Sequence, residues 1–529
     1  MINLKASPCA EGVVQSTLAA RNCIARQKPW ILAVAILASS IAYIDESVVN
    51  VALPAIETDL GASAVVVQWL VNAYTLCLSA LLLVGGAAGD RFGRRLIFVI
   101  GTGVFGAASL WCTVSPNVVH LILARGLQGM GAALLIPSSL AIIGASFDES
   151  ERGKAIGTWA GVSAVAAALG PLLGGWIVDH FSWRLIFLIN PPLAVLTIWI
   201  ALSQVPESRD PEANQGMDWR GALLALIGLG SLAYGLIAMP TRGASDSTVV
   251  VSLSAGTLLL LLFVWEESRS GSPMLPLGLF RSRTFSAVNL LTLLLYAALG
   301  GTFFFLPFAL IEVQNYPATS AGAVFLPFTI IMGALSRWSG GLLDRFGARL
   351  PLVIGPMISA LGFALLGIAV TGSSYWGFLA PIVILGLGMT ISVAPLTTTV
   401  LNAVPAHQTG VASGINNAVA SVASLFAVAV LGAVALGLFD HALDRRLATG
   451  PVTAEVSRAI QAAHGQFVIA PAVSMVRGDD RLVAEAIIKT SLAESIRTIM
   501  WIAAGLALGA GAAGTLLPGR RAGRRFAAQ

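Results

Sequence analysis

The chain has very little charge. Of its 529 residues, 11% are Asp, Glu, Lys or Arg, whereas 56% are hydrophobic. Soluble domains carry roughly a quarter charged residues, so this composition could not cover a globule of this size with polar surface. The deficit excludes a soluble protein and places the chain in lipid.

Signatures of several enzyme classes are also missing. A phosphate-binding Gly-x-x-x-x-Gly-Lys-Ser/Thr loop is absent, because the Gly153-Lys154 pair is followed by Ala155. There is no His-Glu-x-x-His or Gly-x-Ser-x-Gly motif, and the five histidines fall in or near expected loops. The four cysteines form no Cys-x-x-Cys motif. We expect neither an ATP-driven pump nor an enzyme, and no cofactor or metal.

Long apolar runs are what the chain has instead. About fourteen segments of roughly 18–25 mostly apolar residues can each cross a hydrocarbon core about 30 Å thick. Their continuous apolarity predicts helices, since barrel strands would alternate. The predicted fold is therefore an all-α polytopic membrane protein. The segments lie near residues 31–53, 68–88, 96–114, 118–140, 156–178, 184–203, 219–239, 248–266, 286–310, 319–337, 351–370, 375–397, 411–437 and 496–517.

The basic residues favour one orientation. With the N-terminus inside, most of the 31 Lys and Arg residues fall on the cytoplasmic side, while the short outer loops hold only Arg184 and Arg242. This asymmetry predicts cytoplasmic N- and C-termini; we expect the protein in the cytoplasmic (inner) membrane of a bacterium. The net charge of +5 then reflects membrane insertion and contact with anionic lipid, not nucleic-acid binding.

The tetrapeptide Asp-Arg-Phe-Gly occurs twice, beginning at Asp90 and at Asp344. A charged turn at matching places in two apolar arrays indicates a transporter of duplicated halves, with its small-molecule substrate site between them. When the two copies are aligned, the predicted helices 7 and 8 have no counterpart and form an insertion between the halves. We expect these two helices to pack at the periphery and to contribute no acid to the cavity. The predicted parts are a cytoplasmic N-terminal arm (1–30), a six-helix bundle (31–203), linkers with inserted helices 7 and 8 (204–284), a second six-helix bundle (285–517) and a basic cytoplasmic tail (518–529).

Polar residues 439–495 interrupt the second half before its last span. They show helical periodicity near 454–463 and 482–495 and are expected to form an extracytoplasmic subdomain too weakly hydrophobic to fold alone. The apolar run 467–473 is too short to cross a bilayer and forms either a hairpin core or an interfacial dip. The loop could hinder release, gate the exit or contact an envelope partner; otherwise we expect a monomer.

Charged residues surround both copies of the repeat. Asp90 could lie at a neighbouring helix N-terminus while the arginines meet carboxylates or lipid phosphate, and such a latch would hold one gated state. The alternative is a loop that only sets topology. The second copy has Ala348 where the first has Arg94, so its latch should be weaker. The gating candidates are Asp90, Arg91, Gly93, Arg94, Asp344 and Arg345.

Two acids, Asp45 and Glu46, lie in the first span. An ionised carboxylate there costs several kcal/mol unless it faces a wet cavity or a partner, so it tends to be protonated and can carry a proton. Adjacent helical residues point about 100° apart, so the two acids cannot face a cavity equally. Glu46 could instead reach the outer interface. Arg125 in the fourth span must find acceptors, either in proton transfer or as a structural tie to backbone carbonyls.

The fifth span contains Pro171, which frees a backbone carbonyl and kinks the helix. The glycines around it allow the helix to rock against a neighbour. The candidates of this segment are Gly161, Gly170, Pro171, Gly174 and Gly175.

Together these motifs resemble the major facilitator superfamily, and within it the fourteen-helix drug:proton antiporter family, well over roughly residues 31–437 and weakly beyond. The family's first-helix motif places its acid at Asp45, with Ser47 where the family has Thr. Its fourth-helix motif places a proton-transfer or ion-pairing arginine at Arg125, and its fifth-helix motif marks antiporters. The resemblance implies two six-helix bundles plus two inserted helices.

The same resemblance implies a proton-coupled antiporter that exports lipophilic, cationic drugs or toxic compounds by alternating access. A dedicated exporter of one endogenous metabolite, antibiotic or siderophore is the alternative. Polar residues elsewhere in the spans could line a cavity or hydrogen-bond between helices. Phe303, Phe304, Phe305 and Phe308 suit a cavity for flat substrates, although lipid-facing packing is favoured. The cavity candidates are Asn50, Gln68, Asn72, Gln128, Asn289 and Tyr296.

Overall fold

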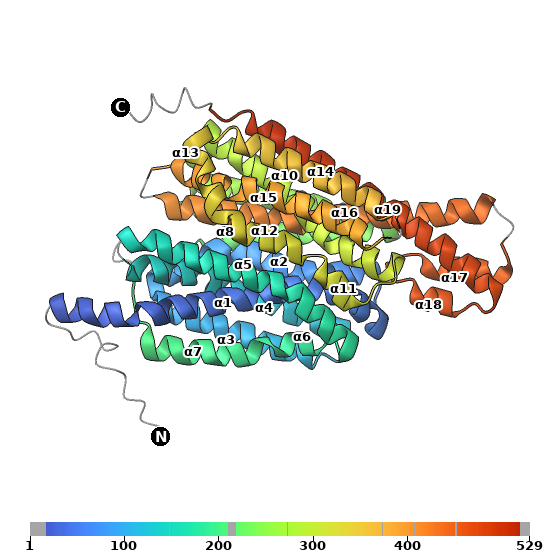
Figure 1. The fold of residues 1–529 in the computed structure, drawn as a ribbon, viewed down its shortest axis with the longest axis horizontal. Coiled ribbons are helices and arrows are strands. Elements are labelled where there is room, and N and C mark those ends of the chain that lie inside the picture. Colours follow the sequence, from blue (N-terminus) through green and yellow to red (C-terminus); the bar gives the residue numbers. More distant parts are fainter. Residues whose placement is uncertain are drawn as a thin grey trace, which may run out of the picture.

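The computed structural model describes residues 17–147, 149–209, 218–271, 273–372, 374–405, 408–449 and 452–518 (Figure 1). Most of the N-terminal arm and nearly all of the basic tail therefore lie outside the described residues. The elements in chain order are α1 (Thr17–Leu60), α2 (Ala64–Phe92), α3 (Arg94–Thr113), α4 (Val118–Ser146), α5 (Glu149–His180), α6 (Leu185–Leu188), α7 (Asn190–Gln204), α8 (Trp219–Arg242), α9 (Ser247–Arg269), η1 (Leu277–Arg281), α10 (Arg283–Phe308), η2 (Ala309–Val313), α11 (Ala318–Ala323), α12 (Leu326–Gly340), α13 (Leu342–Phe346), α14 (Pro351–Ala369), α15 (Trp376–Asn402), α16 (Thr409–Thr449), α17 (Ala454–Ala463), α18 (Ala470–Ser474) and α19 (Asp479–Gly514).

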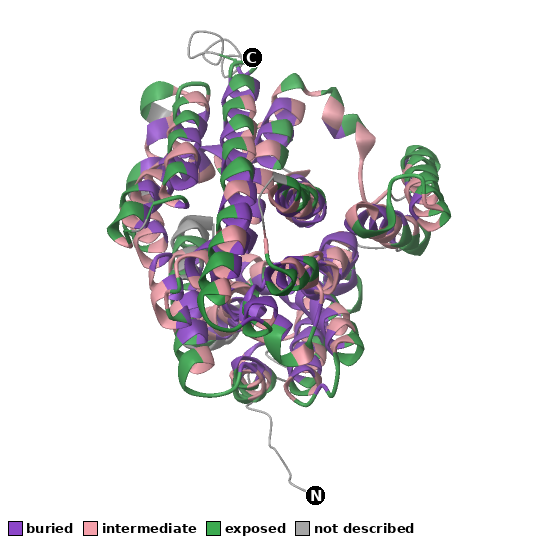
Figure 2. Ribbon diagram, turned by 90° about the vertical axis from the view of Figure 1, so that its right-hand side faces the viewer, coloured by how far each residue is buried: buried purple, intermediate pink, exposed green. Residues whose placement is uncertain are grey.

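Within the described ranges there are 14 helical segments long and apolar enough to cross a membrane, which confirms the predicted all-α polytopic fold. Three of them join two elements each, namely α6 with α7, α10 with η2, and α11 with most of α12. Figure 2 shows exposed residues around the rim of the bundle and buried residues facing inward. Large apolar side chains such as Trp199, Val251 and Leu261 are among the exposed ones, as expected for a surface that faces lipid.

The helix contacts of the first bundle are repeated in the second. In half one (α1–α7), α1 packs on α5, and α3 packs on α4 and α7. In half two (α10–α16 with α19), α10 packs on α16, and α14 packs on α15 and α19. Counted by span, these are the same pairs in the same order, so the duplication read from the Asp-Arg-Phe-Gly repeat is present in the packing.

The two halves meet through exchanged helix pairs. Helix α5 of half one contacts α11 and α12 of half two, and α16 of half two contacts α2 of half one. Glycines allow one of these contacts to be very close, because a Cβ at Gly175 would collide with the backbone of Ala318. Asp179 at the end of α5 accepts hydrogen bonds from the backbone N–H groups of Ala318 and Thr319, at 3.0 and 2.7 Å, and so caps α11.

Helices α8 and α9 form a hairpin beside this arrangement. They pack on each other, and α8 also contacts α2 and α16. Helix α9 has few buried residues, with Val249, Gly256 and Glu267 among them.

The loop between the last two spans is largely helical. Helix α16 continues to Thr449 and α19 begins at Asp479, so both helices extend beyond the rest of the bundle (Figure 1). Helices α17 and α18 come between them in the chain. The predicted helix at 454–463 is α17, and the periodicity at 482–495 belongs to α19, which is continuous with the last span. We call this the loop end of the bundle and the opposite end, which carries Asp90, the latch end.

Candidate functional site

A cavity of about 370 Å³ lies between the two halves. Its wall is formed by α1, α2, α4 and α5 of half one and by α10, α12, α15 and α16 of half two. It is mostly apolar, and the charged side chains that line it are Glu46 and Arg125. Such a concave, apolar site with few polar groups is typical of a small-molecule pocket.

The two halves contribute different side chains to this wall. Half one supplies the charged residues, Glu46 and Arg125, together with Asn50 and Tyr74. Half two supplies the phenylalanines and methionines, which are Phe303, Phe304, Phe325, Phe328, Met332 and Met389. The ring of Phe303 meets those of Phe325 and Phe328 edge-on, at centroid distances of 5.1 and 5.2 Å.

Asp45 lies one layer behind the cavity, inside half one. It is fully buried and forms an ion pair with the Arg125 guanidinium. Its other carboxylate oxygen accepts hydrogen bonds from the side-chain amides of Gln128 and Asn190, both at 2.7 Å. Gln128 also donates to the Ser109 hydroxyl at 2.8 Å. A buried ion pair is favourable only when such additional hydrogen bonds satisfy its remaining atoms, and here both oxygens of the carboxylate have partners.

Arg125 joins this cluster to the cavity. Its Nε donates to the backbone carbonyl of Leu70 at 3.3 Å, and its guanidinium lies over the Tyr74 ring at 4.5 Å from the centroid. The sequence left open whether Arg125 pairs with a carboxylate or hydrogen-bonds to backbone carbonyls. In the structure it does both, with Asp45 and with Leu70. It lines the cavity while it holds Asp45, so a change in Asp45 can reach the wall of the cavity.

The arrangement reverses the expectation for the two acids. Glu46, not Asp45, faces the cavity, and the suggestion that Glu46 reaches the outer interface is wrong. The 100° between adjacent helical residues separates them as expected, but the rotation of α1 directs Asp45 toward α4 and α7. Their roles in proton coupling remain predictions.

The six polar cavity candidates divide into three groups. Asn50 and Tyr296 line the cavity, and Gln128 belongs to the Asp45 cluster. Asn289 on α10 instead accepts a hydrogen bond from Asn416 on α16 at 3.1 Å. Gln68 and Asn72 are buried on α2 outside the cavity wall, and Gln68 lies against Gly432 of α16. Asn289 thus hydrogen-bonds between helices, which was the alternative open from sequence, whereas the side-chain amides of Gln68 and Asn72 are buried without a hydrogen-bond partner among the described residues.

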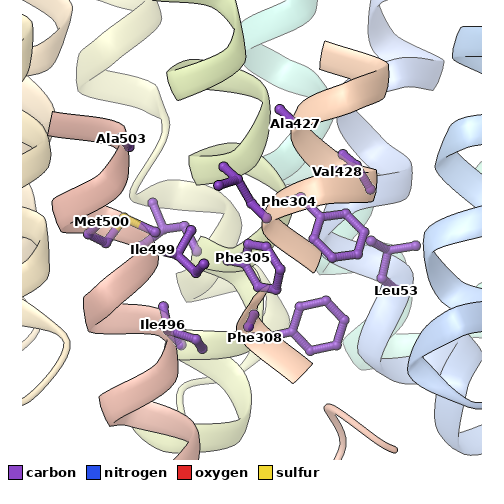
Figure 3. Packing of buried hydrophobic residues seen from close by; sticks show 14 of the residues in the cluster. Leu53, Phe304, Phe305, Phe308, Ala427, Val428, Ile496, Ile499, Met500 and Ala503 are labelled. Carbon is purple, nitrogen blue, oxygen red and sulfur yellow. The ribbon is translucent and has the colours of Figure 1, made fainter. Parts of the chain in front are cut away.

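The phenylalanines of α10 do not face lipid, so that expectation is wrong. Phe304, Phe305 and Phe308 are almost completely buried, and Phe303 and Phe304 line the cavity. Figure 3 shows Phe304 between Val428 and Leu53, and Phe305 directed toward Ile499.

The glycine-rich face of α5 lies against both halves. A Cβ at Gly170 would collide with Ser47 and one at Gly174 with Val48, both on α1, whereas Gly175 faces α11. Pro171 lines the cavity between these contacts. Gly161 has no described atom within 4 Å of a Cβ built there, so packing gives no reason for a glycine at that position.

At the latch end, Asp90 binds Arg94. Its carboxylate accepts from Nε and Nη2 at 2.9 and 2.7 Å. The acid at the N-terminus of α3 is Glu207, which accepts from the backbone N–H groups of Arg95 and Leu96 at 3.0 and 3.1 Å. The expectation that Asp90 would occupy a helix N-terminus is therefore wrong.

Gly93 makes room for that carboxylate. It has a φ of +124°, and a Cβ there would lie 2.8 Å from Glu207. Arg91, which was expected to meet a carboxylate or lipid phosphate, has its guanidinium over the Phe92 ring. In the second copy Arg345 is exposed, and the side chain of Asp344 lies outside the described residues.

Asn190, Ser109 and Glu207 are the partners that sequence reasoning missed. Asn190 precedes two prolines at the start of α7, and this position was the one available signal for it. Ser109 and Glu207 gave none, because a serine in a span and a glutamate in a linker are both ordinary.

Two repeated helix bundles around a cavity lined by one acid and one guanidinium are typical of a membrane transporter. A family model of the Major Facilitator Superfamily matches residues 35–428. The chain belongs to that superfamily, and it is a transporter and not an enzyme.

Similar proteins carry names of resistance and export. Multidrug resistance protein Stp of Mycobacterium tuberculosis (strain CDC 1551 / Oshkosh) is 33% identical over 77% of this chain and 75% of its own length. The tetracenomycin C resistance and export protein of Streptomyces glaucescens is 34% identical over 77% and 76%. The puromycin resistance protein pur8 of Streptomyces alboniger is 36% identical over 78% and 84%.

Solved structures agree on the fold. A bacterial homolog of the human lysosomal transporter Spinster superposes with a TM-score of 0.65 at 14% identity, covering 92% of this chain and 97% of that one. The POT family transporter PepTSo gives a TM-score of 0.61 at 17% identity, covering 95% of this chain and 99% of that one. At these identities the likeness concerns the fold alone.

Proposed function

We propose that this chain is a proton-coupled antiporter that exports lipophilic, cationic drugs or toxic compounds by alternating access. The observation that carries the proposal is the pairing of a cavity acid with a separate, buried acid on adjacent residues of α1. Glu46 lies in the cavity, and Asp45 lies behind it in contact with Arg125. The names of the resistance and export proteins among the relatives support the export of drugs.

Glu46 is suited to recognise the charge of the substrate. A carboxylate in a largely apolar cavity attracts a cation far more strongly than it would in water. The phenylalanines of half two offer flat, polarisable surfaces to an aromatic ring and a face to a cation. A neutral or anionic aromatic compound would gain only the contact of its ring with these phenylalanines.

Asp45 is suited to carry the proton. Protonation removes its charge and ends the attraction that holds Arg125, so the guanidinium must find other acceptors or move. Arg125 lines the cavity, and its movement would change the wall that the substrate contacts. Proton binding and cation binding would therefore disfavour each other, as antiport requires.

We place the protein in the bacterial inner membrane with the latch end in the cytoplasm and the loop end outside. The surplus of Lys and Arg at the latch end supports this orientation, and anionic lipid would contact those residues. Maleimide labelling of intact cells tests it. Of the loop positions, Arg458 is exposed and suitable, whereas Ala484 is buried and would not label in either orientation. Labelling of Arg458→Cys only after permeabilisation would contradict this topology.

The function is tested in proteoliposomes that enclose a pH-sensitive dye. With a pH gradient imposed, addition of ethidium as the cationic probe should make protons flow down the gradient in the intact protein, and Asp45→Asn should abolish this movement. Asp59→Asn is the matched control, since Asp59 lies on the same helix but pairs with Arg184 at 2.7 Å. Uphill ethidium transport without proton movement would refute proton coupling.

A dedicated exporter of one compound is the second candidate. It is favoured by relatives named for a single antibiotic, tetracenomycin C or puromycin. Drug susceptibility of a deletion strain separates the two: sensitivity to many unrelated cations supports the first, and sensitivity to one compound supports the second.

A further inference from the structure

The 465–473 segment of the loop, which follows α17 and ends within α18, contains several buried side chains. Phe467 is fully buried, and Val468 and Ala472 are each 1% exposed. The apolar part of the segment, residues 467–473, was expected to be a hairpin core or an interfacial dip. It is neither, because it packs against the loop end of the transmembrane bundle itself.

Phe467 inserts among the phenylalanines of α10. Its ring centroid lies 6.4 Å from that of Phe304, 5.5 Å from Phe305 and 5.4 Å from Phe308. Phe304 also lines the cavity. One aromatic ring therefore separates the substrate cavity from a loop residue.

Two buried carboxylates hold the backbone of the segment. Glu57 on α1 accepts hydrogen bonds from the N–H groups of Phe467 and Val468, at 2.9 and 3.0 Å. Glu312 in η2 accepts from Ile469 at 3.0 Å. Glu57 is 2% exposed and Glu312 9% exposed. Consecutive backbone N–H groups directed at carboxylates form a specific seat, because buried donors and acceptors without partners are costly.

The seat is built from both halves, although the segment is tethered to only one. Glu57 belongs to half one, as does Ala64, whose N–H donates to the Gly465 carbonyl at 3.0 Å. Glu312 belongs to half two, as does Asp440 on α16, which accepts from the Gly465 N–H at 3.2 Å. The chain on either side continues into α16 and α19, which are also in half two.

We infer that residues 465–473 are a plug that closes the loop end of the cavity, and that Glu57 and Glu312 are the positioning residues that seat it. When the halves separate at this end, the plug stays with half two and leaves Glu57 and Ala64. Glu57 thus joins the halves only in the state closed at the loop end, whereas Glu312 keeps the plug attached throughout the cycle. This inference rests on the alternating-access function proposed above.

The test follows the accessibility of a buried plug residue. Ala472→Cys changes a small side chain in the plug, and its reaction with a membrane-impermeant maleimide at the loop end is timed in purified full-length protein, with the parent chain as background. Glu57→Met, which removes the acceptor but keeps the length, should raise the labelling rate about tenfold, because labelling of a buried site follows the population of the open state. Glu57→Gln, which keeps one acceptor oxygen, should raise it less.

Asp59→Asn is the matched control and should leave the rate unchanged, and Arg458→Cys on the surface of α17 should label rapidly in every variant. If both Glu57 variants leave the rate at Ala472→Cys within about twofold of the parent, the plug is not seated by Glu57 and the inference fails. The readout needs no proton gradient. Loss of proton coupling with the labelling pattern intact would therefore refute the proposed function and leave the plug in place.

Discussion

In half one, the cavity is bordered by Glu46 and Arg125, with Asp45 held behind them by three polar side chains. In half two, the facing wall has no charged side chain among its described residues and includes four phenylalanines and two methionines. The interval between the two Asp-Arg-Phe-Gly copies lays Leu299 over Asp45 and Leu379 over Arg125. The duplicated bundles therefore share helix packing and differ in the chemistry of the cavity wall. Half one supplies its charged side chains, and half two supplies its phenylalanine and methionine side chains.

Among the substitutions that test this difference between the halves, Asp45→Asn should have the largest effect on transport. We expect uphill efflux to fall to the level of empty liposomes, because the charge that changes with protonation is gone, while the protein still inserts. Arg125→Gln should destabilise the protein by about 3–5 kcal/mol, since it leaves Asp45 buried without its ion-pair partner. Combining the two substitutions should restore thermal stability in detergent and leave transport absent. Full active efflux by Asp45→Asn would move the coupling role to Glu46.

Glu46→Gln should act on charged substrates alone. We expect the Kd for a cationic dye such as ethidium to rise about tenfold, which corresponds to about 1.4 kcal/mol. Binding of an uncharged aromatic compound of similar size should stay the same, because its contacts are with half two. Fluorescence titration in detergent measures both. An equal loss for both compounds would show that Glu46 shapes the cavity and does not recognise charge.

Phe303→Ala tests the opposite wall. Loss of its edge-on contacts with Phe325 and Phe328 should weaken binding of cationic and neutral aromatic compounds alike, by about 0.5–1.5 kcal/mol. The same titration applies, and Leu290→Ala, an exposed position on the same helix, is the control. A loss confined to cations would contradict the division between the halves.

The smallest effect is expected at the latch end. Asp90→Asn removes a half-exposed ion pair with Arg94, which is worth about 0.2–1 kcal/mol, so turnover should slow a few-fold while the substrate Kd is unchanged. Asp344→Asn should slow it less, since Ala348 replaces the matching arginine in the second copy. Stopped-flow transport and equilibrium binding separate the two quantities. A tenfold weaker Kd with normal turnover for Asp90→Asn would show that the latch is not a gate.

The spans, their number and the repeat could be predicted from sequence because they depend on local apolarity and on a contiguous motif. The direction of Asp45 could not, since the angle between adjacent residues is fixed by the helix but its absolute rotation depends on Arg125 and Asn190 elsewhere in the chain. Phe304 and Phe305 are apolar, and an apolar residue in a span suits lipid and a protein interior equally. The seat of Phe467 depends on Glu57, which lies 410 positions away.

The position of α19 has a consequence for how the protein is made. Half one is complete once the chain has reached Gln204, so its helices can assemble while synthesis continues. Half two cannot, because α10 and α14 both pack on α19, which ends at Gly514 near the end of the chain. Until that last helix enters the membrane, the face of α10 that carries Phe305 is open to lipid or to a chaperone. A premature stop after α16 would thus leave a complete half one attached to a half two that lacks α19. The surfaces of α10 and α14 that normally pack on α19 would be exposed, and quality-control proteases would act on this form.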